Sequence, residues 1–258
     1  MKKIALFNQK GGCAKTTSVI NIAGSLAKRG NRLLVVDCDP QANLTKALLM
    51  ELDEEPTQSI VEVMNQTADI NEVIVTAPIR TRGNANPKDI GIDILPTNRT
   101  MATITPASDY VLKEAIASVR KEYDYVIYDC PPYMSEFTVN ILAASDYVLV
   151  PATVDADSLD GYGELIDTVS VLQAEGINPT LDILGVFLTI YTDRESFDRY
   201  IKMQSAETCG DYFFSQTIRR HTYAKQTRLF GRPLCYYKPK SAVANDYESL
   251  VDEMLNRM

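Results

Sequence analysis

The sequence predicts an α/β fold in which helices cover both faces of a mostly parallel sheet. Short apolar runs rich in β-branched residues recur along the chain, and segments with the periodicity of amphipathic helices separate them. These runs are apolar at successive positions, which is typical of strands buried on both faces. Because no repeat, low-complexity tract or linker interrupts the alternation, we expect residues 1–258 to form a single, doubly wound domain.

The first strand, helix and second strand are expected close to the N-terminus. Lys3–Asn8 is centred on Ile-Ala-Leu-Phe and predicts a buried strand. Thr16–Arg29 carries one broad apolar face and predicts a helix, after which Gly30 stands where a C-cap glycine belongs. Arg32–Val36 predicts the next strand.

The same alternation continues through the rest of the chain. An apolar stripe between residues 250 and 255 predicts a C-terminal helix that packs on the body of the protein. The segment Arg80–Lys88 is the best candidate for a loop or hairpin turn. Further strands are expected at Asp124–Tyr128, Asp146–Val150 and Leu181–Leu188, and helices at about 106–121, 136–144, 158–175 and 194–208.

Composition excludes several classes of protein. No stretch of about 18 apolar residues occurs, so we expect no membrane-spanning helix. The apolar run near the N-terminus is too short for a signal peptide. The five cysteines are scattered, without a Cys-x-x-Cys pair, which favours reduced thiols in the cytoplasm over a disulfide framework, structural zinc or an iron–sulfur cluster.

The charge of the chain is unevenly distributed. The net charge of −8 argues against a uniformly basic nucleic-acid-binding protein. Residues 212–245, however, hold seven basic side chains and no Asp or Glu, which leaves −15 for the remainder. A local anion-binding surface therefore remains possible.

The most specific motif is Lys-Gly-Gly-Cys-Ala-Lys-Thr-Thr at residues 10–17, between the first predicted strand and helix. Successive backbone N–H groups at a helix N-terminus can surround phosphate groups, and glycines allow the close approach. In this setting Lys15 would reach the β- and γ-phosphates, and the Thr16 hydroxyl would ligate Mg²⁺. The predicted nucleotide-binding residues here are Lys10, Gly11, Gly12, Cys13, Ala14, Lys15, Thr16 and Thr17.

Two later strands end in aspartates. Asp37 and Asp39 follow the second strand in Asp-Cys-Asp-Pro-Gln, and Asp129 ends the apolar run Tyr-Val-Ile-Tyr before Cys-Pro-Pro. Carboxyl ends of strands are where open α/β sheets bind ligands. Asp129 can therefore hold a water on Mg²⁺, as in a Walker B strand. Asp37 either supports the loop or is a solvated strand end.

These motifs together resemble the ParA/Soj/MinD group of P-loop ATPases with a deviant Walker A sequence. The resemblance implies the P-loop NTPase fold and ATP hydrolysis with Mg²⁺. It makes Lys10 the signature lysine that reaches the other subunit's ATP in a sandwich dimer. It makes Asp39 a contributor to the Mg²⁺ shell and to positioning the attacking water, and it points less specifically to Thr189 and Pro239 as base contacts. Ala14 departs from the family's glycine.

Resemblance to the short ParA/Soj class implies a DNA-partitioning function. Such proteins bind nonspecific DNA as ATP dimers, act on the nucleoid with a ParB-like centromere-binding partner, and hydrolyse ATP slowly until stimulated. No helix-turn-helix segment precedes the first strand. By position, the expected DNA-binding residues are Arg194, Arg220, Lys225 and Arg228, although individual charges could instead pair with acidic groups.

Two other functions stay open. A MinD-like ATPase that associates with membranes would need a basic amphipathic C-terminal helix, whereas the polar face here carries four acidic residues against Arg257. A regulatory protein that uses ATP as a switch and hardly hydrolyses it is compatible with Ala14. An iron–sulfur reductase related to this group is not indicated, because Cys38 and Cys130 do not have the spacing that would bridge a cluster.

Overall fold

A computed structural model describes residues 1–52, 54–79, 90–155 and 160–258. Within these residues, seven strands form one sheet in the order β3-β4-β2-β5-β1-β6-β7, and all neighbouring strands are parallel except the edge pair β3 and β4. The doubly wound prediction is confirmed. The strands are β1 Lys2–Leu6, β2 Leu33–Asp37, β3 Val75–Thr76, β4 Ile92–Leu95, β5 Tyr125–Asp129, β6 Tyr147–Thr153 and β7 Asp182–Thr189.

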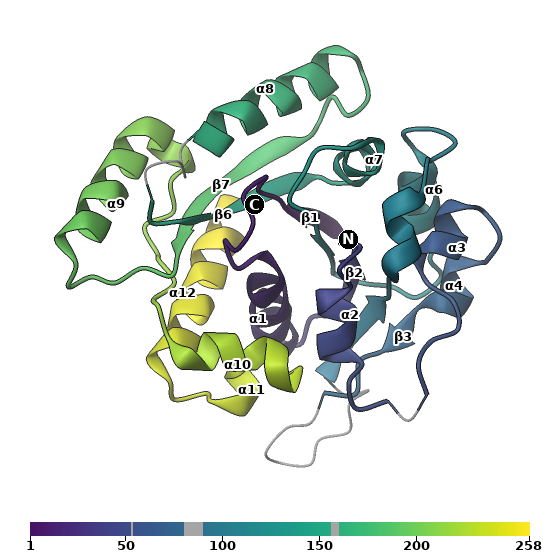
Figure 1. Ribbon diagram of the computed structural model, residues 1–258, viewed down its shortest axis with the longest axis horizontal. Coiled ribbons are helices and arrows are strands. Elements are labelled where there is room, and N and C mark those ends of the chain that lie inside the picture. The colour runs from purple at the N-terminus through teal and green to yellow at the C-terminus, as the bar shows by residue number, and fades with distance from the viewer. Residues whose placement is uncertain (53, 80–89, 156–159) are drawn as a thin grey trace.

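Helices occupy both faces of this sheet (Figure 1). The long helices α1, α8 and α9 begin and end within two residues of the predicted helical segments, and α12 contains the apolar C-terminal stripe. The helices are α1 Lys15–Lys28, α2 Asn43–Leu48, α3 Ile60–Met64, α4 Ile70–Val73, α6 Val111–Ala117, α7 Glu136–Ala143, α8 Asp160–Ala174, α9 Ser196–Cys209, α10 Thr222–Phe230, α11 Leu234–Tyr237 and α12 Ala242–Arg257, with 3-10 turns η1 Arg99–Thr103 and η3 Gly210–Tyr212.

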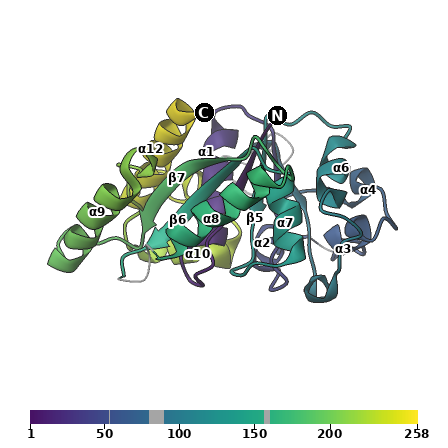
Figure 2. The same cartoon turned by 90° about the horizontal axis from the view of Figure 1, so that it is seen from above.

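Side chains that alternate along a strand pack into two separate hydrophobic cores, one on each face of the sheet. In β1, Ile4 and Leu6 pack with α1 and α12, whereas Ala5 and, directly after the strand, Phe7 pack on the other face with α3, α6, α7 and α8. This division follows from the two-residue periodicity of a strand and explains why its apolar run is continuous. Seen from above, α9 and α12 lie at one end of the molecule, and α3, α4 and α6 lie at the other (Figure 2).

The predicted helix at 106–121 is shorter than expected. It is α6, which covers only Val111–Ala117, because side chains from other elements bind the flanking backbone. Asn140 Nδ2 donates to the Ser108 carbonyl at 2.9 Å, and Asn71 Oδ1 accepts from the Arg120 N–H at 2.8 Å. The expected turn at Arg80–Lys88 lies outside the described residues.

The C-terminal apolar stripe packs on the body of the protein, as expected. Leu250, Val251 and Met254 of α12 are fully buried against α1 and the sheet. Among the described residues, no helix is both long enough and apolar enough to cross a membrane.

Candidate functional site

The phosphate-loop segment lies at the carboxyl end of β1 and leads directly into α1. Its backbone turns through left-handed conformations at Gly12 (φ 80°) and Ala14 (φ 66°). The Asn8 side chain accepts a hydrogen bond from the Lys10 N–H at 2.8 Å, which fixes the start of the loop. The loop is therefore held in a shape that places backbone N–H groups at the N-terminal end of α1, the arrangement that favours anions.

The Lys15 ammonium folds back over this loop. It donates to the backbone carbonyls of Asn8 at 2.8 Å and Lys10 at 3.1 Å, and only 8% of the residue is exposed. The loop backbone thus sets the direction of the side chain. A phosphate group seated on the loop would lie beside this cation.

Ala14 occupies the left-handed position that the family's glycine would accept without strain. A Cβ in this region costs an L-residue about 1–2 kcal/mol. Ile190 (φ 58°), which lines the same pocket directly after β7, is a second non-glycine residue in this conformation. Strained backbone of this kind concentrates at functional sites, and the sequence reasoning did not identify Ile190.

Two predicted nucleotide contacts lie beneath the loop. The Thr189 hydroxyl is fully buried and lies 3.1 Å from both the Cys13 carbonyl and the Ala152 carbonyl, to which it donates. The Thr189 side chain therefore anchors the loop to the sheet, and a contact of this residue with the base stays a prediction. The Cys13 thiol is also buried, and burial raises its pKa, so it is an inert filler.

The aspartates that end β2 and β5 are neighbours in register and fully buried. Asp37 accepts hydrogen bonds from the Asp39 N–H at 3.2 Å and from the Thr45 N–H and hydroxyl, each at 2.8 Å. Burial raises the pKa of Asp37 to about 6. Its role as a loop support is thereby favoured, and the solvated strand end is excluded.

Asp129 differs from its neighbour because neither carboxylate oxygen has a hydrogen-bond partner among the described residues. Burial first, and then the adjacent Asp37 carboxylate, raises the pKa of Asp129 well above its usual range. A buried carboxylate is stable in its charged form only when a cation or donors compensate it. The position beside Thr16 and Lys15 therefore suits a divalent cation.

A pocket of about 390 Å³ joins these elements. The loop residues meet Asp39 there, and two basic residues of α10, Lys225 and Arg228, complete the wall. Pro239 is not part of this wall; it is exposed in a separate pocket of about 280 Å³ with Tyr223 and Lys238. The lining of the phosphate-loop pocket is Gly11, Gly12, Ala14, Lys15, Thr16, Thr17, Asp39, Asn43, Pro132, Ile190, Lys225 and Arg228.

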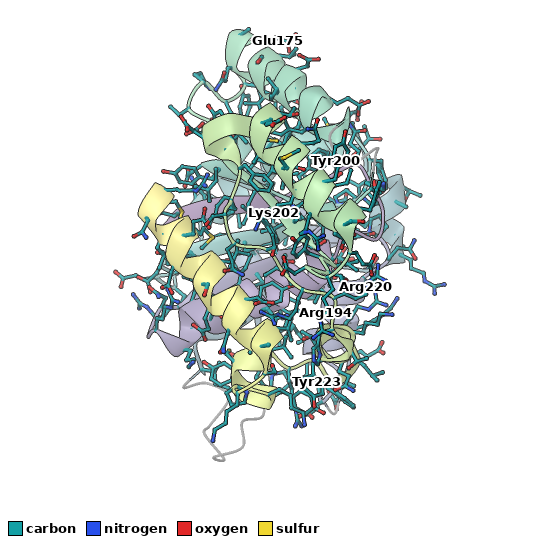
Figure 3. The ribbon with its side chains drawn as sticks, turned by 90° about the vertical axis from the view of Figure 1, so that its left-hand side faces the viewer. Glu175, Arg194, Tyr200, Lys202, Arg220 and Tyr223 are labelled. Carbon is teal, nitrogen blue, oxygen red and sulfur yellow. The ribbon has the colours of Figure 1, made fainter. Side chains whose placement is uncertain are left out.

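The four basic residues expected to bind DNA line two different pockets. Lys225 and Arg228 face the phosphate-loop pocket, whereas Arg194 and Arg220 line a shallow pocket of about 750 Å³ beside α9, where Lys202 joins them (Figure 3). The placement of Lys225 and Arg228 follows from α10 folding back over α1 and α2, as the 3.4 Å contact between Asn21 Nδ2 and Thr227 Oγ1 illustrates for α1. Which of the four residues bind DNA stays a prediction.

Some basic side chains of residues 212–245 pair with acidic groups elsewhere. Arg219 binds Asp246 through two nitrogens at 2.7 Å, and Arg232 binds Glu51 at 2.7 Å. His221 caps α10, with Nδ1 accepting from the Tyr223 N–H at 3.1 Å. These residues therefore have structural partners, while Arg194 and Arg220 remain exposed.

The signature lysine also has a partner that the sequence reasoning missed. The Lys10 ammonium forms an ion pair with Asp155, which follows β6. Asp155 also accepts from the Thr153 hydroxyl at 2.5 Å. Its place just beyond the carboxyl end of a strand beside β1 was the available signal.

Comparisons with known proteins agree with this geometry. A family model described as an AAA domain matches residues 1–183. The chain is 31% identical to the sporulation initiation inhibitor protein Soj of Bacillus subtilis, over 98% of both proteins. It is 30% identical to the chromosome partitioning protein ParA of Caulobacter vibrioides, over 100% of this chain and 95% of that protein.

Solved structures show the same architecture. A cobyrinic acid a,c-diamide synthase from Mycobacterium smegmatis, with a bound ATP analogue and magnesium, aligns with a TM-score of 0.82 at 29% identity, over 99% of this chain and 94% of that one. The cell-division ATPase MinD of Pyrococcus furiosus has the same fold, with a TM-score of 0.77 at 23% identity over 100% and 99% of the two chains. Taken with the phosphate loop and its carboxylates, these relationships show that the chain belongs to the ParA/Soj-type family of P-loop ATPases.

Proposed function

We propose that this protein is an ATP-dependent DNA-partitioning ATPase. The observation that carries the proposal is the single pocket in which a phosphate loop, Lys15, Thr16 and Asp39 converge, with the unpartnered Asp129 carboxylate behind it. A relative named as a chromosome partitioning protein, which aligns over nearly the whole chain, supports the biological role.

The residues fit Mg²⁺ together with ATP. Oxygen ligands are what Mg²⁺ prefers, and Thr16, Asp39 and Asp129 supply them, directly or through water. When bound, the ion neutralises charge on the β- and γ-phosphates. The buried Asp129 carboxylate, which has no hydrogen-bond partner among the described residues, would then gain a positive charge in addition to that of the nearby Lys15.

Hydrolysis would depend mainly on positioning and on neutralising charge. The loop N–H groups and Lys15 hold the phosphates, and Asp39 orients the attacking water. Arg228 and Lys225 face the same space and would add positive charge near the nucleotide. We expect turnover to be slow until a partner stimulates it.

The dimer would form face to face over two ATP molecules, with Lys10 of each subunit completing the other's site. Closure of the dimer would place two copies of the surface formed by Arg194, Lys202 and Arg220 on the same assembly. Basic side chains bind phosphate backbones without reading sequence, and two linked surfaces bind more tightly than one. DNA binding would then require ATP and end with hydrolysis, on the nucleoid and with a ParB-like partner.

The MinD-like alternative is less well supported. The apolar stripe of α12 is buried in the core, so it is not available to insert into a membrane. A weakly hydrolysing ATP switch has one observation in its favour, the left-handed Ala14 in the loop, because a strained loop would change nucleotide affinity or turnover.

The decisive test is a titration of a nonspecific DNA duplex with the protein in ATP, in ADP and without nucleotide, at several salt concentrations. We expect tight, salt-sensitive binding with ATP alone. Equal binding in all three conditions would contradict the ATP switch. Binding to anionic vesicles instead of DNA would support the MinD-like alternative. ATP turnover measured with and without DNA separates an active ATPase from a weakly hydrolysing switch.

A further inference from the structure

We propose that a second pocket, separate from the phosphate-loop pocket, binds a small amphipathic carboxylate and that its occupation fixes Asp39. The pocket has about 330 Å³ and lies where the chain leaves β2 and β4, between Ala42 and Thr45 on one side and Pro96 and Thr97 on the other. Ligands of open α/β sheets bind outside such carboxyl ends. Binding of the carboxylate is independent of the proposed function. Only an effect on ATP turnover, through Asp39, rests on the proposed function.

The body of the pocket is apolar. Leu49, Pro56 and Pro96 contribute to its wall, and Met50, about half exposed (51%), lies at its edge. Its volume is at the small end of the range of about 300–1,000 Å³ that ligand pockets span. A short alkyl chain therefore suits it better than a nucleotide or a large cofactor.

The polar groups of the pocket favour an anionic head group. Two exposed basic residues, Lys46 and Arg99, line the pocket together with one acidic residue, Glu55. Lys46 donates to the Gln41 carbonyl at 2.6 Å, whereas Arg99 has no ion pair within the described part of the chain. An arginine with free N–H groups can bind a carboxylate through two parallel hydrogen bonds.

A buried hydroxyl adds an unused polar atom to the wall. Thr97 is 4% exposed, and its Oγ1 has no hydrogen-bond partner among the residues described. Leaving such a group unpaired is costly, and Thr97 is part of the pocket lining. A ligand oxygen there would supply the missing partner.

The same wall is connected by hydrogen bonds to the phosphate-loop pocket. The Thr97 N–H donates to Thr45 Oγ1 at 3.0 Å, and the Thr45 hydroxyl donates to Asp37 at 2.8 Å. Asp37 in turn accepts from the Asp39 N–H at 3.2 Å. Two residues that line the pocket therefore take part in the network that holds Asp39.

This connection gives the ligand a defined effect. A carboxylate that immobilises Thr97 and Thr45 also restricts Asp37, and through it the backbone of Asp39. Because Lys15 and the phosphate loop are not in this chain of hydrogen bonds, ATP affinity should change less than the position of Asp39.

Binding is tested with hexanoate as the probe, using amide NMR of the whole chain. We expect saturable shifts for residues 42–50 and 97–99, weaker shifts with 1-hexanol, and none with hexylamine. Arg99→Gln should weaken hexanoate binding about tenfold, as the loss of a charged hydrogen bond predicts. Lys113→Gln, which removes an exposed charge on α6, is the matched control. Absence of saturable shifts with hexanoate, or equal binding of 1-hexanol, would overturn the site.

The connection to Asp39 is tested with Thr45→Val, which removes the linking hydroxyl, and Thr45→Ser, which keeps it. Hexanoate should shift the Asp39 amide resonance in the native protein and in Thr45→Ser, and much less in Thr45→Val, which should still bind the probe and keeps only the backbone N–H bond to Asp37. An unchanged Asp39 resonance in the native protein at saturation would overturn the coupling. A protein that did not hydrolyse ATP would contradict the proposed function. The NMR measurements of hexanoate binding and of the Asp39 resonance would still test the present proposal.

Discussion

Lys10 and Asp155 form an ion pair within one chain, between the phosphate loop and the segment that follows β6. Both side chains are about one-third exposed, so the pair is accessible to solvent. A lysine engaged in this way is not free to reach a second subunit. The sandwich dimer proposed above therefore requires the pair to break first.

We predict that Asp155→Asn promotes ATP-dependent dimerisation, because it releases Lys10. Exposed ion pairs contribute about 1 kcal/mol each at most, and each dimer breaks two of them, so the midpoint should move to an up to about thirtyfold lower protein concentration. Sedimentation measures this midpoint. The control is Asp252→Asn, which breaks the ion pair between Arg29 and Asp252 of α12 and changes the net charge by the same amount. A midpoint at the same concentration as in the native protein would show that the pair does not restrain Lys10.

Replacing Ala14 with glycine should stabilise the fold. The native backbone at Ala14 is left-handed, and relief of that strain outweighs the added entropy of an unfolded glycine by about 1 kcal/mol. Ala206→Gly, at an exposed helical position of α9, should instead destabilise by about 1 kcal/mol. Chemical denaturation gives both free energies of unfolding. A loss of stability in both variants would show that Ala14 is not strained.

The two groups of basic residues should respond differently to substitution. Arg194→Ala combined with Arg220→Ala should weaken binding to all DNA sequences and reduce the slope of log affinity against log salt by about 0.9 for each phosphate that is no longer neutralised. Lys225→Ala combined with Arg228→Ala should mainly raise the ATP concentration required, since these residues face the phosphate-loop pocket. If the second pair alone flattened the salt dependence, the DNA surface would lie on α10.

The cysteines should be unreactive in the folded protein. All five are free and buried, and burial raises the pKa of Cys209 to about 11 and that of Cys235 to about 12. The thiolate is the reactive form, so alkylation by iodoacetamide at pH 8 should be slow until denaturant is added. Mass spectrometry counts the labelled sites. Rapid labelling of any one of them in the native state would contradict its burial.

The sheet and the long helices could be predicted from the sequence, because continuous apolar runs and helical periodicity both report burial. The short elements between residues 43 and 76 were not, since helices of four to six residues are stabilised mainly by tertiary contacts. One signal was available: Ser59 and Glu62 form the capping box of α3.

The phosphate and carboxylate residues could be predicted because their motif is local. The roles of Thr189, Lys225 and Arg228 could not, because they depend on how distant segments pack. The fold of α10 over α2 requires Gly231, which is left-handed (φ 57°) and whose absent Cβ would lie 1.9 Å from the Ala47 carbonyl oxygen. That contact follows no periodic pattern in the sequence, so sequence periodicity could not predict it.

The central claim, that the loop pocket is an ATP site, is tested most directly by calorimetric titration of Mg²⁺-ATP into the native protein and Lys15→Ala. Lys15 lies over the loop, held by the Asn8 and Lys10 carbonyls, and removal of its charge takes away the cation beside the phosphates. We predict saturable binding to the native protein and a loss of at least about tenfold in affinity for the variant. Equal affinity in the two proteins would contradict the assignment.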